Sequence, residues 1–257
     1  MHEGTPPETV GLVGGETGAA TAVRDAGWRL VEGSPATVLA ADPDAVLAVG
    51  QSALLALGRG CPTSPILAVG ECPGVAPVSE RAVASALDAL AAGDATTRTH
   101  PVLDVSVHDE RAGRACLDVT VEAAEVGRIS AFALGAGDRS LGSLRADGVV
   151  VATPAGTHGY AARLGAPTVA PETGVLAVEP ISQFATVRNR WITADESVTV
   201  TVTRDEVPVQ VLADDRVVAE AADGDVVSIA RAGGFETVVV PGASASPGRG
   251  DAELEKH

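Results

Sequence analysis

The side chains best suited to chemistry lie together in one stretch, residues 153–160, which reads TPAGTHGY. This stretch offers two threonine hydroxyls, the imidazole of His158 and the phenol of Tyr160. Its two glycines permit backbone geometries that other residues avoid, and Pro154 has no N–H with which to extend a strand. Such a turn can bring hydroxyls, rings and bare backbone N–H groups to one place, which suits the oxygens of ribose and phosphate. From the local pattern alone, an ordinary Gly/Pro turn between two strands is the alternative interpretation.

A short buried strand is expected to hold this turn. Residues Val149 to Ala152, reading VVVA, have the length and the β-branched content of such a strand. Asp147 and Gly148 precede it, so a carboxylate and a tight turn flank one end of the strand while residues 153–160 follow the other.

The first third of the chain predicts parallel strands joined by helices. Three short apolar runs, Val10–Val13, Ala45–Val49 and Ile66–Val69, each end directly on a glycine. Helix-compatible segments separate or follow them: Thr17–Ala26, Ser34–Ala41, Ser52–Leu57 and Val78–Leu90. This repetition is typical of a parallel sheet with crossover helices, in which ligands bind outside the carboxyl ends of the strands.

After Leu90 the pattern changes to strands. Strand-like runs follow one another with no helix of useful length between them: Val102–Val107, Leu117–Val121, Ile129–Leu134, Val198–Val202, Val207–Leu212, Val217–Ala219 and Val226–Ile229. Residues 198–203 alternate between valine and threonine, which is typical of a sheet that is wet on one face. We predict a small N-terminal parallel α/β domain (residues 1–97), a C-terminal β-sandwich (98–243) and a polar tail (244–257).

Composition limits the class of protein. The chain has 257 residues, of which 46% are hydrophobic, enough for a proper core, although only 2% are aromatic. The formal net charge is −16, and Lys256 is the only lysine. This charge disfavours nucleic acids and anionic membranes as partners, because their phosphates would be repelled. It is also what we expect in a very salty cytoplasm, where screening weakens self-repulsion; GC-rich codon usage with a chance acidic bias is the alternative.

The three cysteines, Cys61, Cys72 and Cys116, are widely spaced and have no histidine partners at metal-binding spacing. A reduced protein with buried thiols is therefore favoured over a disulfide, and no metal site is predicted from the chain's own side chains. No apolar run approaches the roughly 18 residues of a membrane helix, and the N-terminus lacks the features of a signal peptide. We expect a cytoplasmic protein.

Residues 147–160 also resemble a known signature, the DG-x-x-x-x-TP-x-G-[ST]-x-x-Y motif of the NAD kinase family. Residues 164–167 (LGAP) and 179–182 (EPIS) resemble that family's GGP and TPI segments at the expected spacing. The resemblance is specific from about Arg114 to Ile229 and much weaker before Arg114. It implies the family's two-domain fold, NAD bound between the domains, and a homo-oligomer, either a dimer or a tetramer.

The resemblance implies a phosphotransferase that uses ATP and Mg²⁺ to phosphorylate the 2′-hydroxyl of NAD. In that family the aspartate of a GGDG loop is the usual candidate for the general base. The corresponding loop here, residues 49–55, carries Gln51 in place of the aspartate, flanked by Gly50 and Ser52 as expected nucleotide contacts. An amide can hydrogen-bond a hydroxyl but cannot take its proton near neutral pH.

Only the acidic residue is present of a second family signature, an Asn-Glu or Asn-Asp pair. Asp118 matches the acid, and Leu117 replaces the asparagine that contacts the dinucleotide. A solvated residue on an edge strand is the alternative interpretation of Asp118. Asp147 matches the family's acid that commonly contacts the nicotinamide end. Asp214 and Asp215 resemble the family's DG turn, which is usually just a hairpin.

The turn itself keeps the family pattern at Thr153, Gly156, Thr157 and Tyr160, which the resemblance implies as dinucleotide contacts. His158 stands where the family has threonine. Histidine can hydrogen-bond ribose or phosphate and ordinarily titrates near neutrality, so His158 is a candidate for a replacement contact and, less readily, for a base.

Three hypotheses are consistent with a kept fold signature and altered polar positions. The first is an active NAD kinase-like phosphotransferase in which Asp118, Asp147 or His158 accepts the proton. The second is a catalytically silent dinucleotide-binding protein, acting as a sensor or as the partner of a true kinase. A kinase for lipids or sphingoid bases is the third, and it is weaker because the turn resembles the NAD branch more closely.

Overall fold

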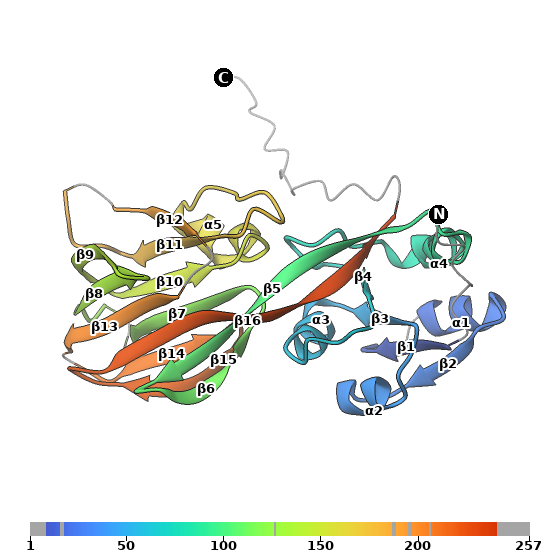
Figure 1. The fold of residues 1–257 in the computed structure, drawn as a ribbon, viewed down its shortest axis with the longest axis horizontal. Helices are drawn as coiled ribbons and strands as arrows, with labels where there is room; N and C mark the ends of the chain where they lie inside the picture. Colours follow the sequence, from blue (N-terminus) through green and yellow to red (C-terminus); the bar gives the residue numbers. More distant parts are fainter. Residues whose placement is uncertain are drawn as a thin grey trace, which may run out of the picture.

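The structure, a computed structural model, describes residues 9–15, 18–125, 127–186, 189–194, 197–205 and 207–240. A helix-covered parallel sheet and a β-sandwich lie end to end along the long axis of the molecule (Figure 1). The fold class predicted from the sequence is therefore confirmed. The predicted polar tail lies outside the described residues. Within them, no helix is long and apolar enough to cross a membrane.

The N-terminal part is a parallel sheet in the order β2-β1-β3-β4. Its strands are β1 (Thr9–Val13), β2 (Arg29–Glu32), β3 (Ala45–Val49) and β4 (Ile66–Val69). Its helices are α1 (Gly18–Asp25), α2 (Pro35–Ala40), α3 (Gln51–Gly58) and α4 (Val83–Ala92), with a 3₁₀ turn, η1 (Glu80–Ala82), before α4. The glycines that end β1, β3 and β4 all have positive φ angles, between 82° and 87°. This backbone conformation favours glycine, which explains the strand–glycine pattern of the sequence.

Two antiparallel sheets form the sandwich. One has the order β12-β11-β10-β7-β14-β15, with bounds Trp191–Ala194, Val175–Ile181, Gly148–Ala152, Asp118–Ala123, Val209–Ala213 and Arg216–Ala221. The other contains β5 (Thr96–Val107), β6 (Glu110–Ala115), β8 (Ser130–Ala136), β9 (Arg139–Ala146), β13 (Val198–Arg204) and β16 (Val226–Val239). A 3₁₀ turn, η2 (Gly156–His158), and a short helix, α5 (Tyr160–Leu164), follow β10.

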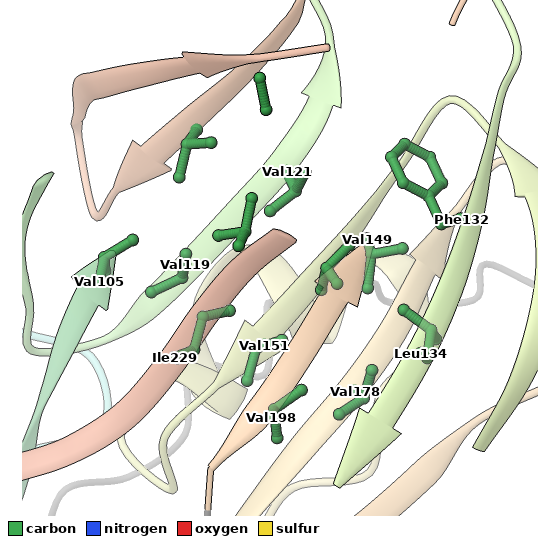
Figure 2. Packing of buried hydrophobic residues seen from close by; sticks show 14 of the residues in the cluster. Val105, Val119, Val121, Phe132, Leu134, Val149, Val151, Val178, Val198 and Ile229 are labelled. Carbon is green, nitrogen blue, oxygen red and sulfur yellow. The ribbon is translucent and has the colours of Figure 1, made fainter. Parts of the chain in front are cut away.

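Small aliphatic side chains fill the space between these two sheets. Val119 and Val149 from one sheet meet Val198 and Ile229 from the other, with Phe132 as the large aromatic of this cluster (Figure 2). Val198, Val200 and Val202 of β13 are fully buried, whereas the threonines between them are only partly so, which confirms the predicted one-sided strand.

Strands β5 and β16 connect the two parts of the molecule. Both run from the sandwich into the N-terminal part (Figure 1), where Thr237 of β16 pairs with Ile66 of β4 in parallel. Val238 is fully buried in the N-terminal core. One sheet of ten strands is therefore continuous through the molecule. Thr97, near which the sequence predicts a boundary, lies at the start of β5.

Some segments differ from the sequence analysis. The helix predicted from Val78 begins only at η1, because Val78 instead forms an isolated parallel bridge with Val69. Strands β2, β6, β9, β11 and β12 are not predicted from the pattern, since β6 and β9 are largely polar and β11 contains Pro180. Cys72 and Cys116 are buried as expected, whereas Cys61 is only half-buried.

Candidate functional site

A pocket of about 250 Å³ opens where the two parts meet. The N-terminal part contributes Gln51, at the start of α3, and Pro73, which follows β4. The sandwich contributes residues of β7, of α5 and of the turn between β14 and β15, among them Asp118, Tyr160 and Asp214. Three residues singled out in the sequence, Gln51, Asp118 and Tyr160, thus line one pocket although they come from distant segments.

Alternation along β7 directs polar side chains to the pocket. Val119 and Val121 face the sandwich core, so Asp118, Thr120 and Glu122 lie on the opposite face, and all three line the pocket. Strand β7 pairs with β10 on one side and β14 on the other. Asp118 is only 7% exposed. The alternative interpretation of Asp118, a solvated residue on an edge strand, is therefore wrong.

The surroundings of Asp118 favour its neutral form. Burial raises the pKa of Asp118, the charge of Asp214 raises it further, and a hydrogen bond with Thr120 acts in the opposite direction. The result is a pKa of about 7. Such a carboxyl populates both protonation states near neutral pH, which is what a proton acceptor requires.

Gln51 reaches the pocket from the glycine turn after β3. Gly50 caps α3 with φ of 82°, and its N–H donates to the carbonyl oxygen of Val69 at 2.8 Å. The side chains of Gln51 and Ser52 are both exposed, and Gln51 is the one that lines the pocket. An amide from the N-terminal part and a carboxyl from the sandwich therefore face the same space.

The turn after β10 is fixed to the start of β7. The Thr153 hydroxyl lies 3.0 Å from the carbonyl oxygens of both Cys116 and Leu117, and it accepts the Gly156 N–H at 3.1 Å. A Cβ atom on Gly156 would lie 2.0 Å from the Leu117 oxygen, so only glycine fits there. This packing holds the entrance to α5 beside Asp118.

The hydroxyls of this turn are used inside the protein. Thr157 donates to the Pro154 carbonyl at 2.7 Å and accepts the Val169 N–H at 3.0 Å, and both Thr153 and Thr157 are completely buried. Each threonine expected to contact a ligand thus has its hydroxyl engaged in shaping the turn. His158 is half-buried and does not line the pocket.

Tyr160 stands at the edge of a group of carboxylates. It is 38% exposed, and burial, followed by the charges of Glu122, Asp118 and Asp147, raises its pKa. Burial and the charge of Asp147 likewise raise the pKa of Glu122. Asp147 does not line the pocket, but its charge acts on Glu122 and Tyr160, which do.

Three residues of this region were not singled out for function by the sequence. Thr120 and Glu122 could have been found, because they follow Asp118 at every second position of a strand. Arg59 contacts both Asp214 and Asp215, at 2.8 Å and 2.6 Å, and nothing in the local sequence pairs residues so far apart.

Mg²⁺ is implied by the family resemblance. Among the described residues, no group of three or more His, Cys, Asp or Glu side chains is arranged to hold a metal ion. The side chains that the structure describes therefore do not fit a resident metal. Magnesium that serves nucleotides is commonly held by their phosphates with one or two carboxylates.

Two solved structures that share this fold are an NADH kinase and an NAD kinase. The yeast NADH kinase, solved with NADH, superposes with a TM-score of 0.75 at 15% identity, covering 91% of this chain and 84% of that one. An NAD kinase from Archaeoglobus fulgidus, solved with ATP, gives 0.73 at 17% identity, covering 91% and 94%. The chain thus shares its fold with these two kinases.

Sequence comparison points to the NAD kinases among proteins of this fold. Residues 118–241 match the family model of the ATP-NAD kinase C-terminal domain. The NAD kinase of Methanosarcina barkeri is 33% identical over 95 residues, and that of Chlorobium phaeovibrioides is 30% identical over 146. These matches cover 37% and 54% of this chain, and 34% and 52% of the relatives, so the chain spans about a third to a half of their length. Residues 118–241 are thus similar to the C-terminal domain of the NAD kinase family.

Proposed function

We propose that the chain binds an NAD(H)-type dinucleotide in the pocket between its two parts and slowly transfers the γ-phosphoryl group of ATP to the 2′-hydroxyl. The single observation that carries the proposal is the meeting of Gln51 and Asp118, from different parts of the molecule, in that pocket. The kinases with the same fold, solved with NADH and with ATP, support both ligands.

Asp118 is the proposed proton acceptor. As the 2′-oxygen forms its bond to the γ-phosphorus, the bond from that phosphorus to the bridging oxygen breaks and ADP leaves. The hydroxyl proton passes to the Asp118 carboxylate, whose pKa of about 7 makes it a competent base near neutral pH. Gln51 orients the hydroxyl by hydrogen bonding, because its amide cannot take the proton. Magnesium, entering with the nucleotide, would neutralise phosphate charge.

A silent dinucleotide-binding protein is the second candidate. The observation that favours it is Gln51, which lines the pocket with an amide at the position where the family has an aspartate. Leu117 likewise replaces the asparagine of the second signature. Such a protein would bind the dinucleotide without forming NADP.

The experiment is NADP formation from NAD and ATP–Mg²⁺ by purified protein in about 1 M KCl, together with calorimetric titration of NAD and NADH. We expect measurable binding and a slow rate. Asp118→Asn should lower the rate by ~10²–10⁴-fold, the usual contribution of a general base, while leaving a fold that still binds. Asp88→Asn, on the exposed side of α4, is the matched control for the loss of one negative charge.

Each outcome decides between the candidates. An unchanged rate in Asp118→Asn would remove Asp118 from the mechanism. Binding without any NADP formation would leave the silent binder as the function. A wild type that binds neither dinucleotide would overturn both.

A further inference from the structure

Asp214 is buried against the segment that carries Asp118. It sits in the turn between β14 and β15 with φ of 55°, and its side chain is 2% exposed. Its Oδ1 atom accepts the backbone N–H groups of Cys116 at 3.0 Å, Leu117 at 2.7 Å and Asp118 at 3.3 Å. In return, the N–H of Asp214 donates to the Asp118 carbonyl oxygen at 2.9 Å. One carboxylate thus holds the entry into β7 from both directions.

Arg59 neutralises this carboxylate from the other part of the molecule. Directly after α3, it places Nε 3.0 Å and Nη2 2.8 Å from Oδ2 of Asp214, while Nη2 also lies 2.6 Å from Asp215. Its side chain is 12% exposed. Arg114 of β6 donates to the Arg59 carbonyl oxygen at 3.2 Å, which anchors the same end of α3 on the sandwich.

Helix α3 therefore has a function at each end. Its first residue, Gln51, lines the pocket, and the residue after its last turn, Arg59, is bound to the turn that fixes Asp118. Because the eight residues from Gln51 to Gly58 form one short helix, displacing Arg59 would also displace Gln51 relative to Asp118.

We propose that Arg59 and Asp214 are positioning residues, an ion pair between the two parts that sets both the place and the charge environment of Asp118. The inference rests on the proposed function for its meaning, because it deepens the role of the same pocket. Neither residue contacts the reacting atoms; both act through Asp118.

The electrostatic consequence has a definite sign. The titratable groups that line the pocket with Asp118 are Asp214 and Asp215 from the β14–β15 turn, Tyr160 from α5 and Glu122 on its own strand. Arg59, directly after α3, pairs with both aspartates of that turn. The negative charge of Asp214 favours protonated Asp118. Arg59 pairs with Asp214 at 2.8 Å, so we expect its positive charge to offset that effect. Removing Arg59 should raise the titration midpoint of Asp118, and removing the charge of Asp214 should lower it.

The test is a pH titration of Asp118 in the whole chain without any ligand, in which NMR records the chemical shift of its carboxyl carbon. We expect Arg59→Met to raise the midpoint and Asp214→Asn to lower it, each by about half a pH unit or more. Arg59→Lys, which keeps the charge, should stay close to the wild type. Arg24→Met is the control that should leave the midpoint unchanged, because Arg24 of α1 forms an exposed ion pair with Glu32 of β2.

If the ion pair were merely structural, Arg59→Met, Arg59→Lys and Asp214→Asn would all lower the melting temperature. The titration midpoint of Asp118 would then not move in opposite directions in Arg59→Met and Asp214→Asn. Either Arg59→Met or Asp214→Asn decides alone if the other does not fold, and an unchanged midpoint in a folded variant overturns the proposal. Where NADP formation is measurable, the acidic limb of its pH profile should move with the midpoint. Failure to bind NAD would instead count against the proposed function, since the titration needs no ligand.

Discussion

At the scale of single residues, the pocket combines an amide that cannot act as a base with a carboxyl that can. Gln51 occupies the helix-start position from which a carboxylate could reach the same space, and Asp118 faces it from β7. The base proposed for this protein therefore lies on the sandwich rather than on the glycine loop.

The first prediction concerns Gln51. Gln51→Asp places a carboxylate at the start of α3, where a helix N-terminus favours negative charge. We expect NADP formation to rise by about one order of magnitude or more, because a second proton acceptor becomes available. Turnover of purified protein with NAD and ATP–Mg²⁺ measures it. Ser52→Asp, one position further along the helix and outside the pocket lining, is the control. A wild type already faster than Gln51→Asp would contradict the prediction.

The second prediction concerns stability against pH. The pKa of Asp118 is about 7 in the folded chain, mainly because of burial, and near 3.9 in an unfolded one. Between about pH 4 and 7 the unfolded chain loses this proton first, so the wild type loses stability as pH rises. Asp118→Asn avoids that loss and should gain stability, roughly 2–4 kcal/mol above pH 7 and little near pH 4.

Thermal unfolding of wild type and Asp118→Asn across this range measures the difference. The buried His100, whose pKa burial lowers to about 4, titrates in both proteins and so cancels in the comparison. A stability difference that is the same at about pH 4 and pH 8 would show that Asp118 is not held neutral by the fold.

At the scale of elements, the turn after β10 depends on one close approach. Gly156 lies against the carbonyl of Leu117, and a methyl group there would overlap it, with 2.0 Å between Cβ and oxygen. A Cβ atom on Gly159, in the same turn, would lie 3.5 Å from its nearest neighbour, the carbonyl oxygen of Gly156, and the φ of Gly159 is negative. Gly156→Ala should destabilise the fold by about 3 kcal/mol, and Gly159→Ala by much less. Denaturant titration of both variants measures this contrast, and equal losses would refute the steric explanation.

The sequence predicts elements where the pattern is local. The valine–threonine alternation of β13 and the glycine-ended strands β1, β3 and β4 are visible in the chain and present in the structure. The turn residues Thr153 and Thr157 were recognised by motif, but their burial depends on Cys116, Leu117 and Val169, which lie elsewhere in the chain. For the same reason no sequence pattern could reveal the pairing of Arg59 with Asp214, because that contact exists only once both parts are folded.

At the scale of the whole molecule, charge is the dominant feature. With a net charge of −16, the folded chain repels itself at low ionic strength, and screening acts within ~3 Å at 1 M salt. We expect the thermal midpoint to rise between about 0.1 M and 3 M KCl. A parallel series in a neutral osmolyte separates charge screening from the general effect of excluded solutes. A thermal midpoint that does not change with KCl would contradict this prediction and favour a chance acidic bias over an adaptation to high salt.

The continuous sheet also has a consequence for the order of folding. The N-terminal sheet is completed by Thr237, and its core by Val238, from the last strand of the described chain. During synthesis, β4 must therefore wait with an open edge until β16 has emerged from the ribosome and crossed the sandwich. Contacts between such distant segments form slowly, and open strand edges invite pairing with other chains. The N-terminal sheet is thus synthesised first, but it can be completed only after the last strand has been made.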